Sequence, residues 1–260
     1  MSSTVSGSVK VSGSTDVGYR LNTDGLQFFL DMYNPRSYPG NGDIIYDLST
    51  KTKDTSLNLT TYTGGTTPYF TTGNTSIDET VNFNSSDLTT NTLTGSFEMV
   101  VRFNPNSAPN YVGIIFGYKL YFFSIQTSVS DLVYGTGNGD LWGCDYDPFS
   151  FYNTWHYITC IMHNCRVGNI TTRTDRILSN QIWIDGVQQT VEQKGSNTPR
   201  SEGFDFSLGR IGITYDDYND NDPSYSGVFD CAMFRIYNRA LTPEEINKNY
   251  KHLKSIYNLS

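Results

Sequence analysis

The stretch that decides the fold is YSGVFDCAMFRIYNRALTPEEINKNY, residues 225–250. Its first half, residues 228–237, is apolar on both alternating faces. One face carries Val228, Ala232, Phe234 and Ile236, and the other carries Phe229, Cys231, Met233 and Tyr237. A strand with two apolar faces is typical of a sheet that is covered on both sides. The stretch therefore predicts a central strand within a β-rich body.

A helix is predicted directly after this strand. Thr242 is a suitable N-cap, Pro243 takes the first helical position, and Glu245 completes a capping box. Leu241 is spaced to pack against Ile246 as a hydrophobic staple. One apolar stripe then continues along the helix through Ile246, Tyr250, Leu253 and Tyr257. We expect this helix, residues 242–254, to be the only one.

The same segment resembles the closing segment of laminin G-like domains, which belong to the concanavalin A-like lectin superfamily. The residues that carry the resemblance are Gly227, Asp230, Arg235, Ile236, Tyr237, Asn238, Arg239, Ala240, Leu241 and Glu245. Looser similarity extends upstream to Leu26 and includes the strand WHYITCIM, residues 155–162. The resemblance implies an all-β, two-sheet antiparallel jelly-roll sandwich of the kind found in large bacterial viruses and bacteria.

The chain is organised as an arm followed by one domain. Residues 1–24 are rich in Ser, Gly and Thr and hold too little bulky apolar surface to form a core. Residues 25–260 carry the alternating runs that predict strands, and we expect them to form the single jelly-roll domain. In the hairpin at residues 181–187, Asp185 and Gly186 can adopt the positive φ angles that a tight two-residue turn requires.

Composition excludes several classes of function. The formal charge of −8 argues against a nucleic-acid partner, which needs a concentrated basic surface. No stretch is apolar and long enough for a signal peptide or a membrane span, so we expect synthesis in a host cytoplasm and no membrane insertion. In that compartment cysteines stay reduced. The four cysteines are Cys144, Cys160, Cys165 and Cys231.

Catalytic patterns are missing from the sequence. Glycanases related to this fold carry an E-x-D-x-x-E triplet on one strand, and no such triplet occurs here. The three histidines, at positions 156, 163 and 252, lack the spacing of a zinc site. We therefore expect no enzyme, and a glycan hydrolase with an unrecognised site is the lesser alternative.

Calcium is the cofactor that the sequence leaves open. Asp217, Asn219 and Asn221 place oxygen donors at every second position, as loops that bind hard cations do. Asp230 lies inside the closing strand, where a buried carboxylate needs either a cation or a pairing partner, and both interpretations stay open. Calcium commonly lies near the sandwich rim in laminin G-like domains, so the resemblance makes Asp47 a candidate ligand together with Asp230.

Aromatic residues in two loops are candidates for binding a ligand. They alternate with Asp and Asn, and sugar recognition uses ring faces for C–H groups and planar polar groups for hydroxyls. The candidates are Trp142, Tyr146, Tyr152, Tyr215, Tyr218 and Tyr225. Because loops at sandwich ends are free to carry such side chains, we expect a binding rim built by residues 135–152 and 213–226. The alternative for each ring is packing within its own loop.

These observations favour a non-catalytic binding module at the surface of a virion. It would be a structural or adhesion protein that binds a glycan, a cell-surface polysaccharide or another part of the host surface, with residues 1–24 contacting other virion proteins. The alternative is a purely structural capsid or fibre decoration protein that makes protein–protein contacts. A homo-oligomer is compatible with both.

Overall fold

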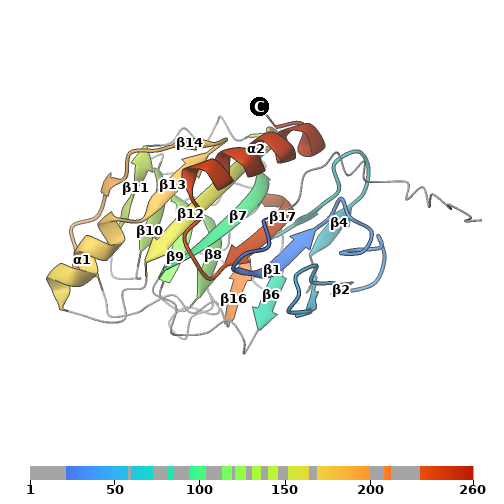
Figure 1. Cartoon of the computed structure of the whole chain (residues 1–260), viewed down its shortest axis with the longest axis horizontal. Helices are drawn as coiled ribbons and strands as arrows, with labels where there is room; N and C mark the ends of the chain where they lie inside the picture. The colour runs from blue at the N-terminus through green and yellow to red at the C-terminus, as the bar shows by residue number, and fades with distance from the viewer. Residues whose placement is uncertain are drawn as a thin grey trace, which may run out of the picture.

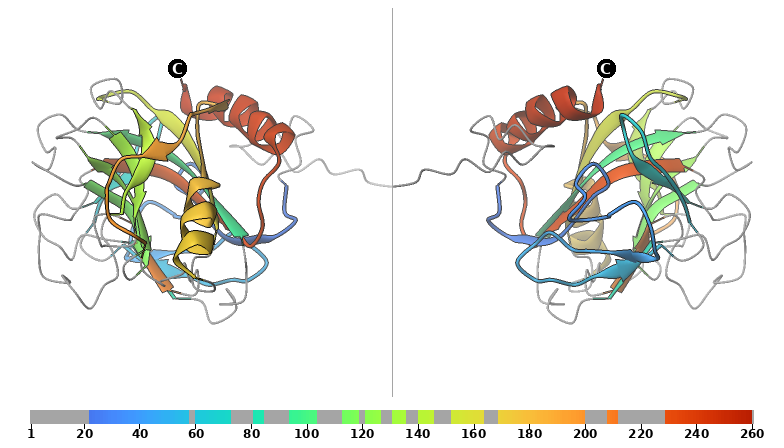
Figure 2. Two further views of the ribbon diagram at one scale, coloured as in Figure 1. Left: turned by 90° about the vertical axis from the view of Figure 1, so that its left-hand side faces the viewer. Right: turned by 90° about the vertical axis from the view of Figure 1, so that its right-hand side faces the viewer.

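The structure of the protein is a computed structural model. The described residues are 22–57, 60–72, 81–84, 94–103, 113–118, 121–126, 131–135, 140–145, 152–163, 169–199, 208–211 and 229–259. Within them, two antiparallel sheets pack against each other, and helix α2 (Pro243–Tyr257) lies across the outer face of one sheet (Figures 1 and 2). This arrangement confirms the predicted all-β, jelly-roll-like sandwich with a short C-terminal helix.

The sheet beneath α2 has eight strands, with the order β14-β13-β12-β7-β17-β5-β4 and with β1 also paired to β17. Its strands are β1 (Leu26–Asp31), β4 (Thr61–Thr63), β5 (Tyr69–Thr71), β7 (Thr94–Phe103), β12 (His156–His163), β13 (Gln181–Ile184), β14 (Val187–Gln188) and β17 (Phe229–Tyr237). All nine residues of β17 are buried, as a strand covered on both faces requires. The prediction of a central closing strand is therefore confirmed.

The opposite sheet has nine strands in the order β15-β11-β10-β9-β8-β16-β6-β3-β2. They are β2 (Ile44–Ile45), β3 (Thr55–Ser56), β6 (Val81–Asn84), β8 (Gly113–Tyr118), β9 (Tyr121–Gln126), β10 (Asp131–Gly135), β11 (Trp142–Asp145), β15 (Glu192–Gln193) and β16 (Leu208–Ile211). The inner core fills the space between the sheets and includes Phe97, Met99, Phe123, Leu132 and Ile158. The rings of Phe97 and Phe123 join the two sheets edge to face, with centroids 5.5 Å apart.

The two faces of β17 differ from the prediction because the strand contains a β-bulge. Its register with β7 shifts between Cys231 and Met233, so the alternation of side chains is interrupted there. The residues that face the inner core are Phe229, Cys231, Phe234 and Ile236. Those in the outer core, beneath α2, include Ala232, Met233 and Tyr237. The sequence analysis assumed strict alternation along the whole strand, so it placed Phe229 and Cys231 on the face opposite Phe234 and Ile236. The bulge inserts one extra residue between the two pairs, and all four side chains therefore share one face.

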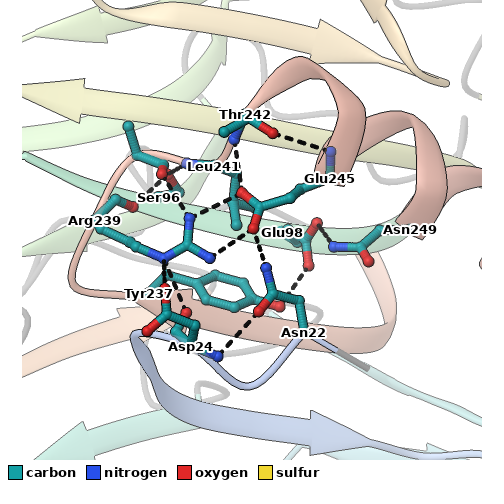
Figure 3. Close-up of polar contacts among 11 residues, drawn as sticks. Asn22, Asp24, Ser96, Glu98, Tyr237, Arg239, Leu241, Thr242, Glu245 and Asn249 are labelled. Atoms are coloured by element: carbon teal, nitrogen blue, oxygen red, sulfur yellow. Dashed lines mark hydrogen bonds and ion pairs between the residues drawn. The ribbon is translucent and has the colours of Figure 1, made fainter. Parts of the chain in front are cut away.

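Helix α2 begins as the sequence predicts. The Thr242 hydroxyl accepts a hydrogen bond from the Glu245 backbone N–H at 3.3 Å, and the Glu245 carboxylate accepts one from the Thr242 N–H at 2.8 Å (Figure 3). Leu241 and Ile246 are both buried in the outer core. The helix extends to Tyr257, three residues beyond the predicted end, and stops at Asn258 in the left-handed conformation.

Helix α1 (Ile170–Leu178) shows that the prediction of a single helix is wrong. Its sequence, ITTRTDRIL, contains three β-branched threonines and little helix propensity of its own. Two features stabilise it. The Asn169 side chain caps its first turn by accepting from the Thr172 N–H at 3.0 Å, and Ile177 is fully buried in the inner core.

The N-terminal end of the described chain is tied to the start of α2. Arg239 forms a two-pronged ion pair with Glu245, with both N–O distances 2.8 Å, and donates to the Asp24 carbonyl at 3.0 Å (Figure 3). Asn22 donates to the same Glu245 carboxylate. The described chain thus contacts the domain three residues before the predicted boundary at residue 25. In the part of the chain that the structure describes, no helix is long and apolar enough to cross a membrane.

The ion pair between Arg239 and Glu245 makes a pH-dependent contribution to stability. Hydrogen bonds from Arg239 hold the pKa of Glu245 below the usual value of a glutamate. A carboxyl group with a lowered folded-state pKa stabilises the fold above its unfolded pKa, and this stabilisation is lost as the pH falls through the folded pKa. Glu245→Gln, which can still serve in a capping box, should lower the free energy of unfolding by about 1 kcal/mol at pH 7.

We expect that difference to shrink as the pH is lowered from 7 to 3, measured by urea denaturation of both proteins at each pH. Glu244→Gln is the matched control, because Glu244 is exposed in the same helical turn. A difference between wild type and Glu245→Gln that stays constant with pH would show that the ion pair does not contribute.

Candidate functional site: a groove beside the β13–β14 hairpin

The prediction that Trp142 is an exposed ligand-binding ring is wrong. Trp142 begins β11, pairs with Tyr134 of β10, and has 0% exposed surface within the inner core. Tyr152 is half-buried and packs against the same core, so its described contacts match the alternative of packing. The remaining ring candidates, Tyr146, Tyr215, Tyr218 and Tyr225, lie outside the described residues.

Asp230 is paired with protein groups. One carboxylate oxygen accepts from the Arg102 guanidinium at 2.7 and 3.0 Å, and the other accepts from the Thr71 hydroxyl at 2.7 Å. The Arg102 guanidinium also lies 4.8 Å from the Tyr69 ring and 4.7 Å from the Trp155 ring. Of the two interpretations that the sequence left open, the structure supports the pairing partner.

Asp47 is a hydrogen-bond acceptor for three backbone amides. Its carboxylate accepts from the N–H groups of Phe29, Ser49 and Lys53 at 2.9, 2.8 and 3.0 Å, and so holds the segment after β2 against β1. The loop candidates Asp217, Asn219 and Asn221 lie outside the described residues. Among the residues that the structure does describe, no group of three or more His, Cys, Asp and Glu side chains is arranged to hold a metal ion.

Three acidic side chains gather around the ammonium group of a lysine. The Lys194 ammonium contacts carboxylate oxygens of Asp131 at 3.3 Å, of Glu192 at 2.7 Å and of Asp145. Burial lowers the pKa of Lys194, but its bonds to Asp145 and Glu192 outweigh this and raise the pKa above its usual value. Lys194 therefore supplies the positive charge that these carboxylates require.

Glu98 is a fully buried carboxylate. It has 0% exposed surface beneath α2 and accepts a hydrogen bond from Tyr157. It also accepts hydrogen bonds from Asn249 at 2.7 Å and from Tyr237 at 3.2 Å (Figure 3). The Arg235 guanidinium lies 3.4 Å from its second oxygen. With both oxygens engaged and the side chain enclosed, Glu98 serves to anchor α2 on the sheet.

Three of the four cysteines are described. Cys144, Cys160 and Cys231 are free and buried, and burial raises the pKa of the Cys144 thiol to about 12. They therefore behave as small apolar residues. Cys165 lies outside the described residues.

An open groove lies between the end of α1 and the β13–β14 hairpin. Its volume is about 530 Å³, within the range of small-molecule sites in proteins. The residues that line this hairpin groove are Leu178, Ser179, Asn180, Gln181, Gln188, Gln189, Thr190 and Val191. Six of the eight side chains are amides or hydroxyls, and none carries a charge. Such groups recognise ligands that both donate and accept hydrogen bonds.

The hairpin is held in place from its turn. Asp185 and Gly186 adopt φ angles of 50° and 77°, which confirms the predicted two-residue turn. The Asp185 carboxylate accepts from the Tyr157 N–H at 2.9 Å and lies 2.6 Å from the His156 ring nitrogen. A Cβ at Gly186 would lie 2.9 Å from the Tyr250 ring of α2, so the turn is packed against that helix. The groove therefore rests on a rigid support.

Two glutamines of the groove are oriented by internal bonds. The Gln181 amide oxygen accepts from the Trp183 indole N–H at 3.0 Å, which leaves its NH₂ group without a partner among the described residues. The Gln189 NH₂ group donates to the Val187 carbonyl at 2.9 Å, which leaves its amide oxygen as an acceptor. The Gln189 backbone N–H donates to the Ile182 carbonyl at 2.9 Å, so Gln189 lies opposite Ile182 across the hairpin, whereas Gln181 lies on the face of Trp183. The two oriented amides therefore lie on different faces of the hairpin.

Apolar surface borders these polar groups. Leu178, at the end of α1, is 43% exposed, and Val187, next to Gln188, is 62% exposed. These two side chains offer apolar contacts next to the polar lining. Sequence reasoning missed this site, and the signal that could have found it is the clustering of Gln181, Gln188 and Gln189 in one hairpin.

Comparison with known proteins supports the fold. No protein-family model matches the chain, and no curated protein matches it. The structure is similar to Trypanosoma rangeli sialidase in complex with sialic acid, with a TM-score of 0.57, 13% identity, and coverage of 89% of this chain and 33% of the sialidase chain. It is also similar to the binding domain of botulinum neurotoxin DC in complex with rat synaptotagmin II, with a TM-score of 0.57, 14% identity, and coverage of 89% of this chain and 52% of the toxin chain.

The chain therefore spans only a third to a half of the length of these proteins. At such identities the similarity shows the fold alone. That fold is an antiparallel, jelly-roll-like β-sandwich, the architecture that the resemblance implied.

Proposed function

We propose that this protein is a non-catalytic recognition module that binds a glycan in the hairpin groove. The observation that carries the proposal is the lining itself, in which oriented amides and hydroxyls lie beside exposed apolar side chains. A sugar ring offers the complementary surface, with hydroxyls for the amides and C–H groups for Leu178 and Val187. Two fold neighbours add support, because one is described with sialic acid and the other is a toxin binding domain.

The chemistry of the groove supports binding without catalysis. None of the described residues that line it is an Asp, Glu, His, Cys, Lys or Tyr, the usual sources of a general acid, a base or a strong nucleophile. Its serine, Ser179, donates to the carbonyls of Asp175 and Arg176 at 2.8 and 2.9 Å. That hydroxyl caps the end of α1.

The proposal predicts that Gln188→Ala weakens glycan binding about tenfold, the effect of losing about 1.4 kcal/mol of binding free energy. Gln188 is exposed on β14, so the melting temperature should stay within about 2 °C of wild type. A glycan array with the full-length chain identifies ligands, and calorimetry on the best of them measures affinity.

Gln193→Ala is the matched control, because Gln193 is an exposed strand glutamine outside the groove. Calorimetry repeated with a chelator tests the calcium hypothesis for Asp217, Asn219 and Asn221, which predicts weaker binding without the ion. Equal losses in Gln188→Ala and Gln193→Ala, or no loss in either, would place the binding site elsewhere.

A further inference from the structure

We infer that Asn41 is a site of spontaneous covalent modification, at which the side-chain amide is converted to isoaspartate through a ring formed with Gly42. The site lies in the loop before β2, whereas the hairpin groove lies beside α1, toward the opposite end of the molecule (Figure 1). The modification therefore does not depend on the proposed function. Its only co-reactant is water.

The reaction joins two neighbouring groups of the chain, since an Asn side chain readily reaches the backbone N–H groups near it. The Gly42 backbone nitrogen attacks the side-chain carbonyl carbon of Asn41, and the new N–Cγ bond closes a five-membered imide ring. The Cγ–Nδ2 bond breaks, and the amide nitrogen leaves as ammonia with the proton of the Gly42 N–H. Water then opens the ring, and isoaspartate forms when the original peptide C–N bond is the one that breaks.

Both reacting groups are free in the structure. Asn41 and Gly42 are exposed, and neither the Asn41 side chain nor the Gly42 N–H has a hydrogen-bond partner among the described residues. A nitrogen whose N–H is held by a carbonyl would have to lose that bond before it attacks. Ring closure at Asn41 does not carry this cost, and water has direct access to open the ring.

Glycine leaves room for the ring. Gly42 has a φ angle of 81°, and a Cβ built on it would meet no atom within 4 Å. Gly40, on the other side of Asn41, has a φ angle of 89°. A residue without a Cβ neither shields its own nitrogen nor restricts the rotation that brings this nitrogen to the side-chain carbonyl carbon. The two glycines therefore leave ring closure unobstructed.

The same ring can form at an Asp–Gly pair, and the structure shows why those pairs are protected. The described residues include two such pairs, Asp24–Gly25 and Asp185–Gly186. The Asp185 carboxylate accepts from the Tyr157 N–H at 2.9 Å, and the Asp24 carboxylate pairs with the Arg239 guanidinium at 3.0 Å. A carboxylate that is ionised and engaged in this way is a poor target for a nucleophile. Asn41 carries a neutral, unengaged amide instead.

The product would disturb a contact between the two sheets. Isoaspartate lengthens the backbone by one carbon between Asn41 and Gly42. The Gly42 carbonyl accepts from the Tyr38 hydroxyl at 2.6 Å, and the buried Tyr38 ring packs against the Tyr62 ring of β4, with centroids 4.6 Å apart. Displacing that carbonyl therefore loosens the packing of the loop before β2 against β4.

The experiment incubates the full-length chain in mildly alkaline buffer at body temperature. Peptide mapping by mass spectrometry, with enzymatic methylation of isoaspartate, then locates the product. Asn41 should react at least about tenfold faster than Asn169, an exposed Asn that is followed by the β-branched Ile170 and accepts from the Thr172 N–H at 3.0 Å. Asn41→Gln should not react, because its longer side chain would have to close a six-membered ring. Peptide mapping reports Asn138–Gly139, which lies outside the described residues, separately.

Thermal unfolding of the aged proteins tests the structural consequence. Aged wild type should melt about 2–4 °C below aged Asn41→Gln, the shift expected for one lost hydrogen bond. Freshly made Asn41→Asp should melt with fresh wild type, because it carries the new charge without the longer backbone. If Asn41 reacts no faster than Asn169, the site is wrong. If Asn41 is modified but aged wild type and aged Asn41→Gln melt together, the loop does not depend on the Tyr38 contact, and the inferred consequence is wrong.

Discussion

Glu98→Leu should lower the free energy of unfolding by roughly 3–5 kcal/mol, the magnitude expected when one partner of a buried ion pair is removed. The substitution leaves the buried Arg235 guanidinium without the carboxylate that lies 3.4 Å away. It also leaves Tyr157 and Asn249 without the acceptor for their hydrogen bonds. Each buried donor that loses its partner adds a penalty, because water does not reach it to replace the lost bond.

Urea denaturation measures the effect as a lower midpoint with an unchanged slope. A second variant, Glu98→Leu with Arg235→Met, removes both charges and should be more stable than the sum of the two single substitutions predicts. Glu244→Leu, at an exposed position of α2, should stay within about 0.5 kcal/mol of wild type. A loss below 1 kcal/mol for Glu98→Leu, or simple additivity in the double variant, would contradict the role of Glu98 as the anchor of α2.

Gly143→Ala should destabilise the fold by about 3 kcal/mol or more, because it overpacks two paired backbones. A Cβ at Gly143 would lie 1.9 Å from the Leu132 carbonyl oxygen and 2.8 Å from the Val133 Cα atom, both on the neighbouring strand β10. Neither atom belongs to a side chain that could rotate away, so β10 and β11 must separate. Because Trp142 and Cys144 flank this glycine in the inner core, the separation would also disturb core packing.

The comparison is with Gly64→Ala, measured by the same urea midpoints. A Cβ at Gly64 would meet only the edge of the Tyr62 ring at 3.7 Å, an ordinary contact, and the change should stay within about 0.5 kcal/mol. Gly143→Ala and Gly64→Ala proteins of equal stability would show that β10 and β11 do not approach each other this closely.

Several features of the fold follow from residues that are neighbours in the sequence. The start of α2 depends on contacts between Thr242 and Glu245, and the hairpin turn depends on Asp185 and Gly186 alone. Interactions over so few residues are encoded directly by residue type, and they were predicted correctly. The burial of β17 on both faces was equally readable, because its apolar run is continuous.

Other features depended on partners that only the folded chain supplies. Asp230 pairs with Arg102 and Thr71, which are 128 and 159 residues away, so no local pattern could choose between an ion pair and a metal. Trp142 was predicted to lie in a loop because glycines precede it, but pairing with β10 turns its ring into the core. Helix α1, rich in threonine, is stabilised by the burial of Ile177 rather than by its own propensity.

The candidate site shows the same division between sequence and tertiary structure. The sequence by itself determined the closing strand, the capped helix and the hairpin turn, because periodicity, capping and turn chemistry act within a few residues. The sandwich class followed from the resemblance of the closing segment to laminin G-like domains. Only the tertiary structure decided where a ligand can bind. It placed the end of α1 beside Gln188 and Gln189, and it removed Trp142 from the surface. The physical reason is that a groove and a buried ring are both defined by which distant segments pack together, and that packing is not encoded in any short stretch of the chain.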